Sequence, residues 1–284
     1  HATIRWPGTE SGKLAYPAWN SLSSAVLKSG IATQYDDDPD GDVWAPLEAD
    51  VTLYDHNWFW SPKNERKRRS VAELMDIYYK SAGHGGVLLL NSTPDTTGRI
   101  PLADRTRYME FGAEIDRRFG HPLTAITSTK AAVSTLKFSK PTPVNHIVLQ
   151  EDYRQGHRIR SYTIEGRTAT GWKTLSTGSA IGHKKIDAFQ TETVQEIKFT
   201  VVKSVNAPLL RSIQAFYVSD FTPSPEAIEN AAWVVCGAWN TANFTNGRDT
   251  LELDLSSFID KPGQYELKFI ADVAVTGTSI DSAT

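Results

Sequence analysis

The stretch "SVAELMDIYYKSAGHGGVLLLN", residues 70 to 91, places a helical pattern directly before an unbroken apolar run. Ser70 and Glu73 form the reciprocal capping pair with which many helices begin. The apolar positions that follow share one helical face: Val71, Leu74, Met75 and Tyr78. The run "GVLLLN" lacks polar alternation, which is typical of a parallel strand covered on both faces. The stretch therefore predicts a helix, a glycine-rich turn at 83–86 and a buried strand.

A second helical pattern follows at residues 100–120, "IPLADRTRYMEFGAEIDRRFG". It begins at Pro101, ends at Gly120 and carries one apolar stripe: Tyr108, Phe111, Gly112, Ile115 and Phe119. Helix, buried strand and helix in this order predict an α/β architecture for residues 1–120.

Beyond residue 120 the pattern changes to short strands separated by turn residues, in 143–153, 158–167, 194–203 and 211–220. Ile197, Phe199 and Val201 alternate with polar neighbours, as expected for a half-buried antiparallel strand. We therefore expect a β-sandwich over residues 121–221. "FTPSPEA" at 221–227 predicts a linker, and residues 222–284 predict an additional β domain, whose completeness the sequence leaves open. The fold class is multidomain, α/β plus all-β.

Composition excludes some classes of function. The 284 residues include 33 acidic and 30 basic side chains, for a net charge of −3. This balance argues against a nucleic-acid or membrane-surface binder, since both need a basic face. The basic run 63–70 contains Glu65 and lacks aromatic residues, so we expect a solvated loop there. The single cysteine, Cys236, excludes an internal disulfide.

Glu48 lies in "WAPLEADVTLYDHNWFW", residues 44–60, among tryptophans. Apolar surroundings disfavour an ionised carboxylate and raise its pKa, so that a proton stays available for a leaving oxygen. Trp44, Trp58 and Trp60 are candidates for that apolar wall, and indole faces also stack on sugar rings. The alternative is a surface carboxylate beside a tryptophan core, which composition alone favours.

A possible calcium loop precedes this stretch. Asp36, Asp38 and Asp40 alternate in "DDDPDGD" and are followed by Gly41, as in the first half of an EF-hand loop. The closing glutamate is missing, because Leu47 stands at its position. A solvated acidic loop is the alternative. If Glu48 were a calcium ligand, it would not be free to donate a proton.

Several segments together resemble the α-L-fucosidases of glycoside hydrolase family 29. "IRWPGTESG" at 4–12 resembles that family's "IRWVGNExG", and residues 44–60 resemble its "WVPAExDVSIRPGWFY". Residues 73–100 resemble "YxxSVGRNGxLLLNxPPxxxGLI". Residues 156–166 and 178–189 resemble the galactose-binding-like domain that often follows the catalytic barrel. The resemblance extends over about residues 1–220.

The resemblance implies a retaining exo-glycosidase with a (β/α)8-like barrel, which removes terminal α-linked fucose with two carboxyl groups about 5 Å apart. By motif position Glu48 is its general acid/base. Arg5 is a candidate donor to the fucose ring, and Trp58 and Trp60 are candidates for packing against its methyl group. The form of the Glu48 motif favours α-1,3/1,4 linkages. No cofactor is implied, and calcium is an option at Asp36–Asp40.

The resemblance also implies a nucleophilic aspartate upstream of the 4–12 motif, in a segment that this sequence does not contain. Residues 1–120 then correspond to the C-terminal portion of the barrel, and we expect a preceding segment of comparable size. The substrate class favours an extracytoplasmic location. The competing hypothesis is a non-catalytic carbohydrate-binding protein that uses the β-sandwich. Tyr153, His157 and Trp172 are its candidate sugar contacts, although for Trp172 we favour a place in the core.

Overall fold

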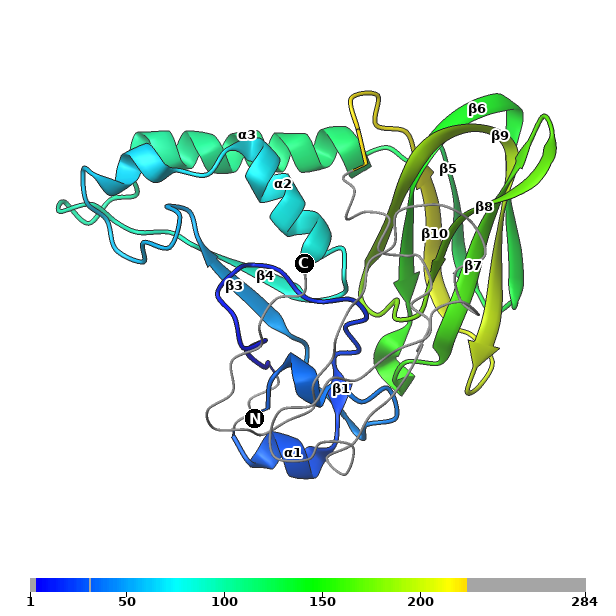
Figure 1. Ribbon diagram of the computed structural model, residues 1–284, viewed down its shortest axis with the longest axis horizontal. Coiled ribbons are helices and arrows are strands. Elements are labelled where there is room, and N and C mark those ends of the chain that lie inside the picture. The colour runs from blue at the N-terminus through cyan, green and yellow to red at the C-terminus, as the bar shows by residue number, and fades with distance from the viewer. Residues whose placement is uncertain (1–3, 31, 224–284) are drawn as a thin grey trace, which may run out of the picture. The chain divides into compact units, whose positions relative to one another are not determined.

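A computed structural model describes residues 4–30 and 32–223 (Figure 1). The described residues all belong to one compact unit. The predicted linker in part and nearly all of the 222–284 domain lie outside the described residues. The described part is mostly β, with few helices and a six-stranded antiparallel sheet.

The first half of the chain holds short strands and the helices. Its elements are β1 (Ser21–Leu22), α1 (Ser24–Lys28), η1 (Gln34–Asp36), β2 (Val43–Trp44), β3 (Glu48–Thr52), η2 (Asn64–Lys67), α2 (Val71–Lys80), β4 (Val87–Asn91) and α3 (Leu102–Phe119). β1 pairs with β2 in antiparallel fashion, and β3 pairs with β4 in parallel.

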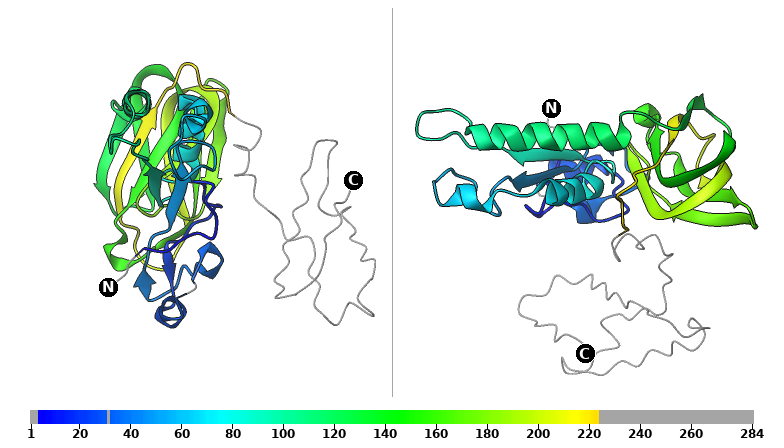
Figure 2. Two further views of the ribbon diagram at one scale, coloured as in Figure 1. Left: turned by 90° about the vertical axis from the view of Figure 1, so that its left-hand side faces the viewer. Right: turned by 90° about the horizontal axis from the view of Figure 1, so that it is seen from above.

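The two helices beside the parallel pair form where the sequence predicts them. α2 begins with the reciprocal cap between Ser70 and Glu73. α3 begins after Pro101 and ends at Gly120. Figures 1 and 2 show α2 and α3 on the same side of β3 and β4. Their apolar faces bury a cluster with the strands that includes Leu53, Tyr54, Leu74, Met75, Tyr78 and Phe111.

Among the described residues, side chains cover one face of the parallel strands and leave the other face exposed. Leu88 and Leu90 of β4 pack against the helix-side cluster. Val87 and Leu89, which alternate with them, are 40% and 47% exposed. Ile4 and Trp6 near the start of the chain are also about half exposed, at 48% and 51%. The expectation that this strand is covered on both faces is therefore met on one face.

The basic run 63–70 folds inward at its end, so the expectation of a solvated loop is wrong for Arg68 and Arg69. The Arg68 Nε donates to the Asp104 carboxylate at 2.6 Å, and Asp104 is 1% exposed. The Tyr54 hydroxyl donates to the other oxygen of Asp104. The Arg69 Nε donates to the Thr52 carbonyl at 2.9 Å. The partner that buries Arg68 is Asp104 of α3, which lies 36 residues away, so residues 63–70 by themselves give no sign of the pairing.

The second half of the described chain forms the antiparallel sheet. Its elements are β5 (Thr124–Thr129), β6 (Val133–Glu151), η3 (Tyr153–Gln155), β7 (Ile159–Thr168), β8 (Gly171–Gly178), β9 (Lys185–Ser204) and β10 (Leu210–Phe216), with strand order β5-β10-β6-β9-β7-β8. The predicted strands are confirmed, and Ile197 and Phe199 are buried as expected. β6 and β9 change register between Lys137 and Thr142, and between Val144 and His146.

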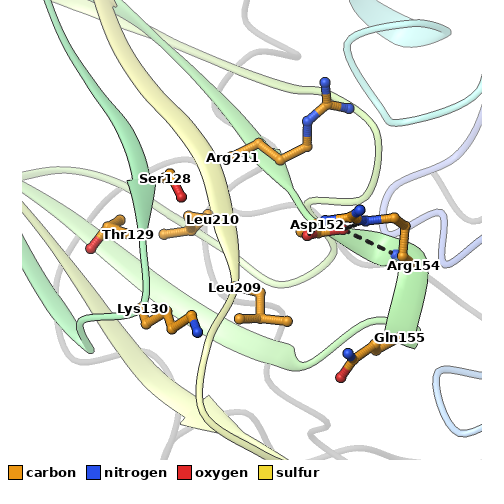
Figure 3. A pocket seen from close by; sticks show the side chains of 9 residues that line it. All are labelled: Ser128, Thr129, Lys130, Asp152, Arg154, Gln155, Leu209, Leu210 and Arg211. Carbon is orange, nitrogen blue, oxygen red and sulfur yellow. Dashed lines mark hydrogen bonds and ion pairs between the residues drawn. The ribbon is translucent and has the colours of Figure 1, made fainter.

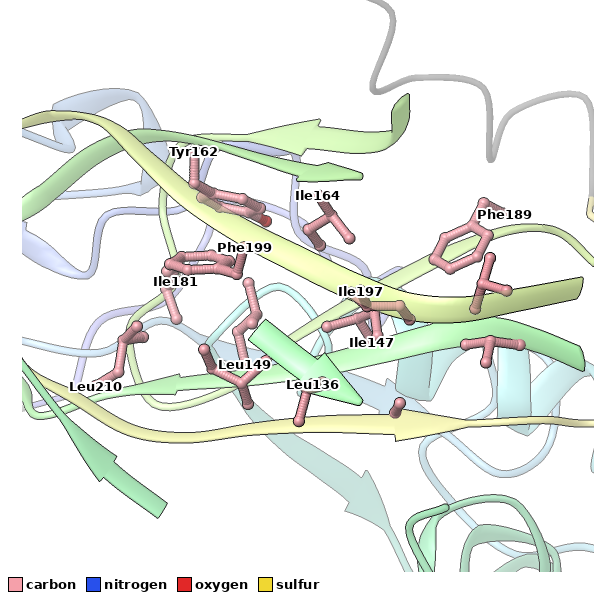
Figure 4. Packing of buried hydrophobic residues seen from close by; sticks show 14 of the residues in the cluster. Leu136, Ile147, Leu149, Tyr162, Ile164, Ile181, Phe189, Ile197, Phe199 and Leu210 are labelled. Atoms are coloured by element: carbon pink, nitrogen blue, oxygen red, sulfur yellow. The ribbon is translucent and has the colours of Figure 1, made fainter. Parts of the chain in front are cut away.

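The sheet encloses its own core, shown in Figure 4. Ile147, Ile164 and Ile197 are fully buried in it. The cluster under α2 and α3 is not confined to the first half, because it also contains Val148, Ile186 and Phe216 from β6, β9 and β10. The two halves therefore share buried apolar surface, which stabilises their contact.

Asn20 links three segments of the first half. It is fully buried and has a φ of +57°, a left-handed conformation that asparagine tolerates better than most residues. Its Nδ2 donates to the carbonyls of Ala18 and Gly85, each at 3.2 Å. Its Oδ1 accepts the Leu47 N–H at 2.8 Å, directly before β3. One side chain thus connects the start of β3 with the turn that precedes β4.

Asn20→Ala should lower the free energy of unfolding by at least about 2 kcal/mol, because it leaves buried backbone groups unpaired and strains the left-handed residue. Asn64, which donates to the Phe59 carbonyl from an exposed position, is the control. Asn64→Ala should change the free energy by no more than about 0.5 kcal/mol. Urea denaturation measures both, and equal losses would contradict the special role of Asn20.

His146 at the junction of the halves is held neutral. Its Nδ1 lies 2.7 Å from the Asn145 Oδ1, so this nitrogen carries the proton, and Nε2 accepts from the Tyr79 hydroxyl at 2.8 Å. The side chain is fully buried, and burial together with the charge of Arg118 lowers its pKa to about 3. The folded protein therefore does not take up a proton here at mildly acidic pH.

This depressed pKa makes stability fall in acid. Below about pH 6.5 the unfolded chain protonates this histidine while the folded chain does not, so stability is lost as pH falls from about 6.5 to about 3. The slope is at most about 1.4 kcal/mol per pH unit. His146→Gln should reduce the slope, and His56→Gln, at an exposed residue, should not. Denaturant unfolding between pH 7 and pH 4 measures the slopes, and an unchanged slope in His146→Gln would contradict this assignment.

Candidate active site

Three chain segments run in parallel beside the candidate catalytic residues. The Arg5 N–H donates to the Pro46 carbonyl at 2.9 Å, and the Glu48 N–H donates back to the Arg5 carbonyl at 2.8 Å. The Val87 N–H then donates to the Leu47 carbonyl at 2.8 Å, where β4 joins β3. The carboxyl ends of the three segments consequently point toward one edge, where α/β proteins gather functional groups.

Glu48 is the first residue of β3 and is half-buried. Its register partner in β4 is Val87, so its side chain lies on the face that α2 and α3 do not cover. None of the residues that the structure describes hydrogen-bonds to its carboxylate, so the group is available to a ligand. Its position at the amino end of β3 differs from the carboxyl end at which barrel enzymes usually hold catalytic groups.

The tryptophans expected around Glu48 have other neighbours. Trp44 stacks on Tyr153 with 4.5 Å between ring centroids. Trp60 packs against the helix-side cluster, and its Nε1 donates to Glu65 at 2.9 Å. Trp58 is half-buried, and its Nε1 donates to the Glu10 Oε2 at 3.0 Å.

Glu10 is a second candidate carboxylate, which the sequence reasoning missed. It follows the carboxyl end of the Arg5 segment, and Trp58 follows the carboxyl end of β3, so the two meet at this edge. Glu10 is exposed, with an indole N–H on one oxygen. The signal was present in the sequence, because the motif "IRWPGTESG" contains this glutamate.

Arg5 is built into the protein interior. Its side chain is 1% exposed, and its Nε donates to the Ala45 carbonyl at 2.9 Å. Its two terminal nitrogens donate to the Thr33 carbonyl and to the Asp37 carboxylate. Burial raises the pKa of Asp37, and the charge of Arg5 opposes that rise. These contacts give Arg5 a positioning role for the 33–37 loop, and its contact with a sugar stays a prediction.

The carboxylates of the predicted calcium loop have separate partners. Asp36 accepts the Thr33 N–H at 2.6 Å and caps η1. Asp38 accepts the Asp40 N–H at 2.8 Å, and Asp40 pairs with Arg160. Within the described ranges, no group of three or more His, Cys, Asp or Glu side chains is arranged to hold a metal ion. Calcium at Asp36–Asp40 stays a prediction.

Two of the sugar-contact candidates in residues 121–221 lie where the halves of the chain meet. His157 is 3% exposed and contacts the rings of Trp19 and Trp44, at 5.2 Å and 5.1 Å between centroids. Tyr153 covers the other side of this group by stacking on Trp44. Trp172 is 45% exposed beneath the Lys198 ammonium, so its assignment to the core is wrong.

Replacing Arg5 tests its positioning role. Arg5→Gln should lower the free energy of unfolding by about 3 kcal/mol, because Asp37 is left as an unpaired buried charge. Asp220, an exposed residue paired with Arg117, offers the control Asp220→Asn, with an expected change below about 1 kcal/mol. Thermal and urea denaturation give both values. A stable Arg5→Gln that only weakens substrate binding would instead support direct contact with the sugar.

Comparison with known proteins finds relatives on both the sequence and the structure level, although no family model matches the chain. "Putative alpha-L-fucosidase 1" of Oryza sativa subsp. japonica is 26% identical over 250 residues, which are 75% of this chain and 48% of the relative. The chain spans about half the length of the curated relatives it matches.

Solved structures agree with these relatives. A structure named as a putative alpha-L-fucosidase of Bacteroides thetaiotaomicron VPI-5482 is 35% identical, with a TM-score of 0.72, over 76% of this chain and 51% of that chain. A Ruminococcus gnavus GH29 fucosidase in complex with fucose is 26% identical, with a TM-score of 0.67, over 77% of this chain and 51% of its own. The similarity to family 29 α-L-fucosidases expected from the sequence motifs is thus confirmed. No described helix is long and apolar enough to span a membrane.

Proposed function

We propose that this chain, which is similar to family 29 α-L-fucosidases over about 76% of its length, is the rear part of a retaining exo-α-L-fucosidase. The observation that carries the proposal is the parallel arrangement of the Arg5 segment, β3 and β4, with Glu48 at the amino end of β3 and Glu10 beyond the carboxyl end of the Arg5 segment. The substrate is a glycan with terminal α-linked L-fucose, and α-1,3/1,4 linkages are the favoured ones.

The three parallel segments belong, in this proposal, to an incomplete (β/α)8-like barrel within residues 1–120. Two observations support the assignment. β3 pairs in parallel with the Arg5 segment before it and with β4 after it in the chain, and α2 and α3 cover one face, as the outer helices of a barrel do. Side chains on other strands would cover the opposite face, with Val87 and Leu89, in a closed barrel. Residues 121–221 form the galactose-binding-like sandwich.

The chain supplies the general acid/base of the double displacement. In the first step a protonated carboxyl gives its proton to the glycosidic oxygen, while a nucleophilic aspartate from residues outside this sequence attacks the anomeric carbon. In the second step the same carboxylate takes a proton from the water that releases fucose. In this proposal the Trp58 indole, whose Nε1 donates to Glu10, packs against the sugar.

Two residues are candidates for the acid/base role. Glu48 matches the family motif and has no competing hydrogen bond among the described residues. Glu10 follows the carboxyl end of its segment and touches Trp58, which agrees with the usual placement of barrel catalytic groups. Physical placement favours Glu10, motif position favours Glu48, and either residue gives the same chemistry. The location we propose is extracytoplasmic, because that is where such glycans are found.

Glutamine replacements at both positions test the mechanism in the complete polypeptide. The variant that lacks the acid/base should lose about 10²- to 10⁴-fold in kcat/KM on a fucosylated oligosaccharide, whose leaving group needs a proton. On an aryl fucoside with an acidic phenol, its loss in the first step should be much smaller. Steady-state kinetics on both substrates give the two ratios.

Glu65→Gln is the matched control, because Glu65 also accepts an indole N–H, from Trp60. It should leave both ratios close to those of the parent protein. Equal loss on both substrates would argue that the residue holds the fold and does not transfer the proton. Full activity in Glu10→Gln and in Glu48→Gln would remove the acid/base from this chain and favour the alternative, a non-catalytic carbohydrate-binding protein.

A further inference from the structure

A hollow lined mostly by polar residues lies at one end of the antiparallel sheet (Figure 3). None of its lining residues belongs to the segments that carry Glu10 and Glu48. Its volume is about 490 Å³, and it is lined from three segments, 128–130, 152–155 and 209–211. A neighbouring hollow of about 380 Å³ shares Asp152, Arg154 and Arg211 and adds Tyr153. The space exceeds that of a small inorganic anion and is in the range of sites for sugars and other small organic ligands.

The hollow carries an excess of positive charge. Arg154 is paired with Asp152 through its Nε at 2.8 Å and a terminal nitrogen at 2.5 Å, and this pairing lowers the pKa of Asp152 to about 2. Lys130 and Arg211 are exposed and have no acceptor among the described residues. The adjacent Glu151 does not neutralise them, because it is fully buried and accepts the backbone N–H groups of Arg158 and Ile159.

The backbones of β5 and β10, which pair with each other, are irregular beside the hollow. Leu210 and Ser212 pair with Glu151 and Gln150, so Arg211 is an extra residue in a bulge of β10. Bulges redirect side chains and are frequent beside binding sites. In β5, Ser128 adopts a φ of +56°, which is unfavourable for a residue with a side chain. Two separate irregularities, the bulge at Arg211 and the left-handed Ser128, therefore lie beside the same hollow.

We infer that this hollow binds a carbohydrate that carries an anionic group, either a sulfate ester or a carboxylate. The Arg211 guanidinium offers a planar pair of donors to the anion, and Lys130 adds a point charge. The Ser128 hydroxyl is available to a sugar hydroxyl, the Thr129 hydroxyl already accepts the Ala131 N–H at 3.1 Å, and Leu209 gives an apolar contact. The carbohydrate part rests on the proposed function, whereas the preference for an anion rests on the hollow itself.

Binding to the complete polypeptide tests the inference without any turnover. The probes are three fucosylated oligosaccharides of the same backbone: uncharged, sulfated and carrying a uronic carboxylate. Titration calorimetry should show that at least one anionic probe binds about tenfold or more tightly than the neutral one, and that its affinity falls as NaCl rises from about 50 to about 300 mM. Whichever anionic probe binds identifies the source of the charge.

The double variant Lys130→Gln with Arg211→Gln should lose about tenfold or more of the affinity for that probe. The control is Lys203→Gln with Arg167→Gln, which removes the same charge from β7 and β9 outside the hollow. It should bind normally. Neither double variant should change hydrolysis of an aryl fucoside, so a failure of fucosidase activity leaves this test unaffected. Equal binding of neutral and anionic probes, no binding of any probe, or equal losses in both double variants would overturn the inference.

Discussion

The buried side chain of Asn20 is the constraint on which the parallel half of the structure depends. It pairs with the Leu47 N–H before β3 and with the Gly85 carbonyl before β4, so both strands begin at positions fixed by one amide. The neighbouring Trp19 carbonyl contacts His157 of the sheet half. A polar group buried this deeply is tolerated because its donor and acceptor are both used. Residues 19 and 20 thus contact both the residue before β3 and His157 in the antiparallel half of the chain.

Coverage of the parallel strands on one face explains how this part of the chain relates to function. On the side of α2 and α3, Ala49 and Val51 of β3 are buried, and Leu88 and Leu90 of β4 pack against the helix-side cluster. Glu48, Val87 and Leu89 lie on the uncovered face. Exposed aliphatic residues beside an available carboxylate are the arrangement expected for the inside of a barrel. The chain spans about half the length of the fucosidase relatives to which it is similar.

The antiparallel sheet packs against the helical half of the chain and also carries the cationic hollow at one of its ends. Val148, Ile186 and Phe216 extend its core beneath the helices, and His146 joins Tyr79 through a hydrogen bond that requires the neutral ring. Arg211, in contrast to the neutral and buried His146, is charged and exposed, and it has no acceptor among the described residues. Apolar burial and neutral hydrogen bonds therefore join the halves, and the excess cationic charge collects at the end of β10 and β5.

The sequence by itself determined the elements that depend on local chemistry. The Ser70–Glu73 cap, the proline and glycine that bound α3, and the period-two strand around Phe199 all lie within a few residues of their own signals. Motif order also identified the relatives. Only the tertiary structure decided which charged groups stay available. Arg5 is buried against Asp37, Arg68 against Asp104, and Glu10 meets Trp58, all through partners at least 32 residues away. Whether a side chain pairs internally or faces a ligand depends on such distant partners, and no local pattern encodes them.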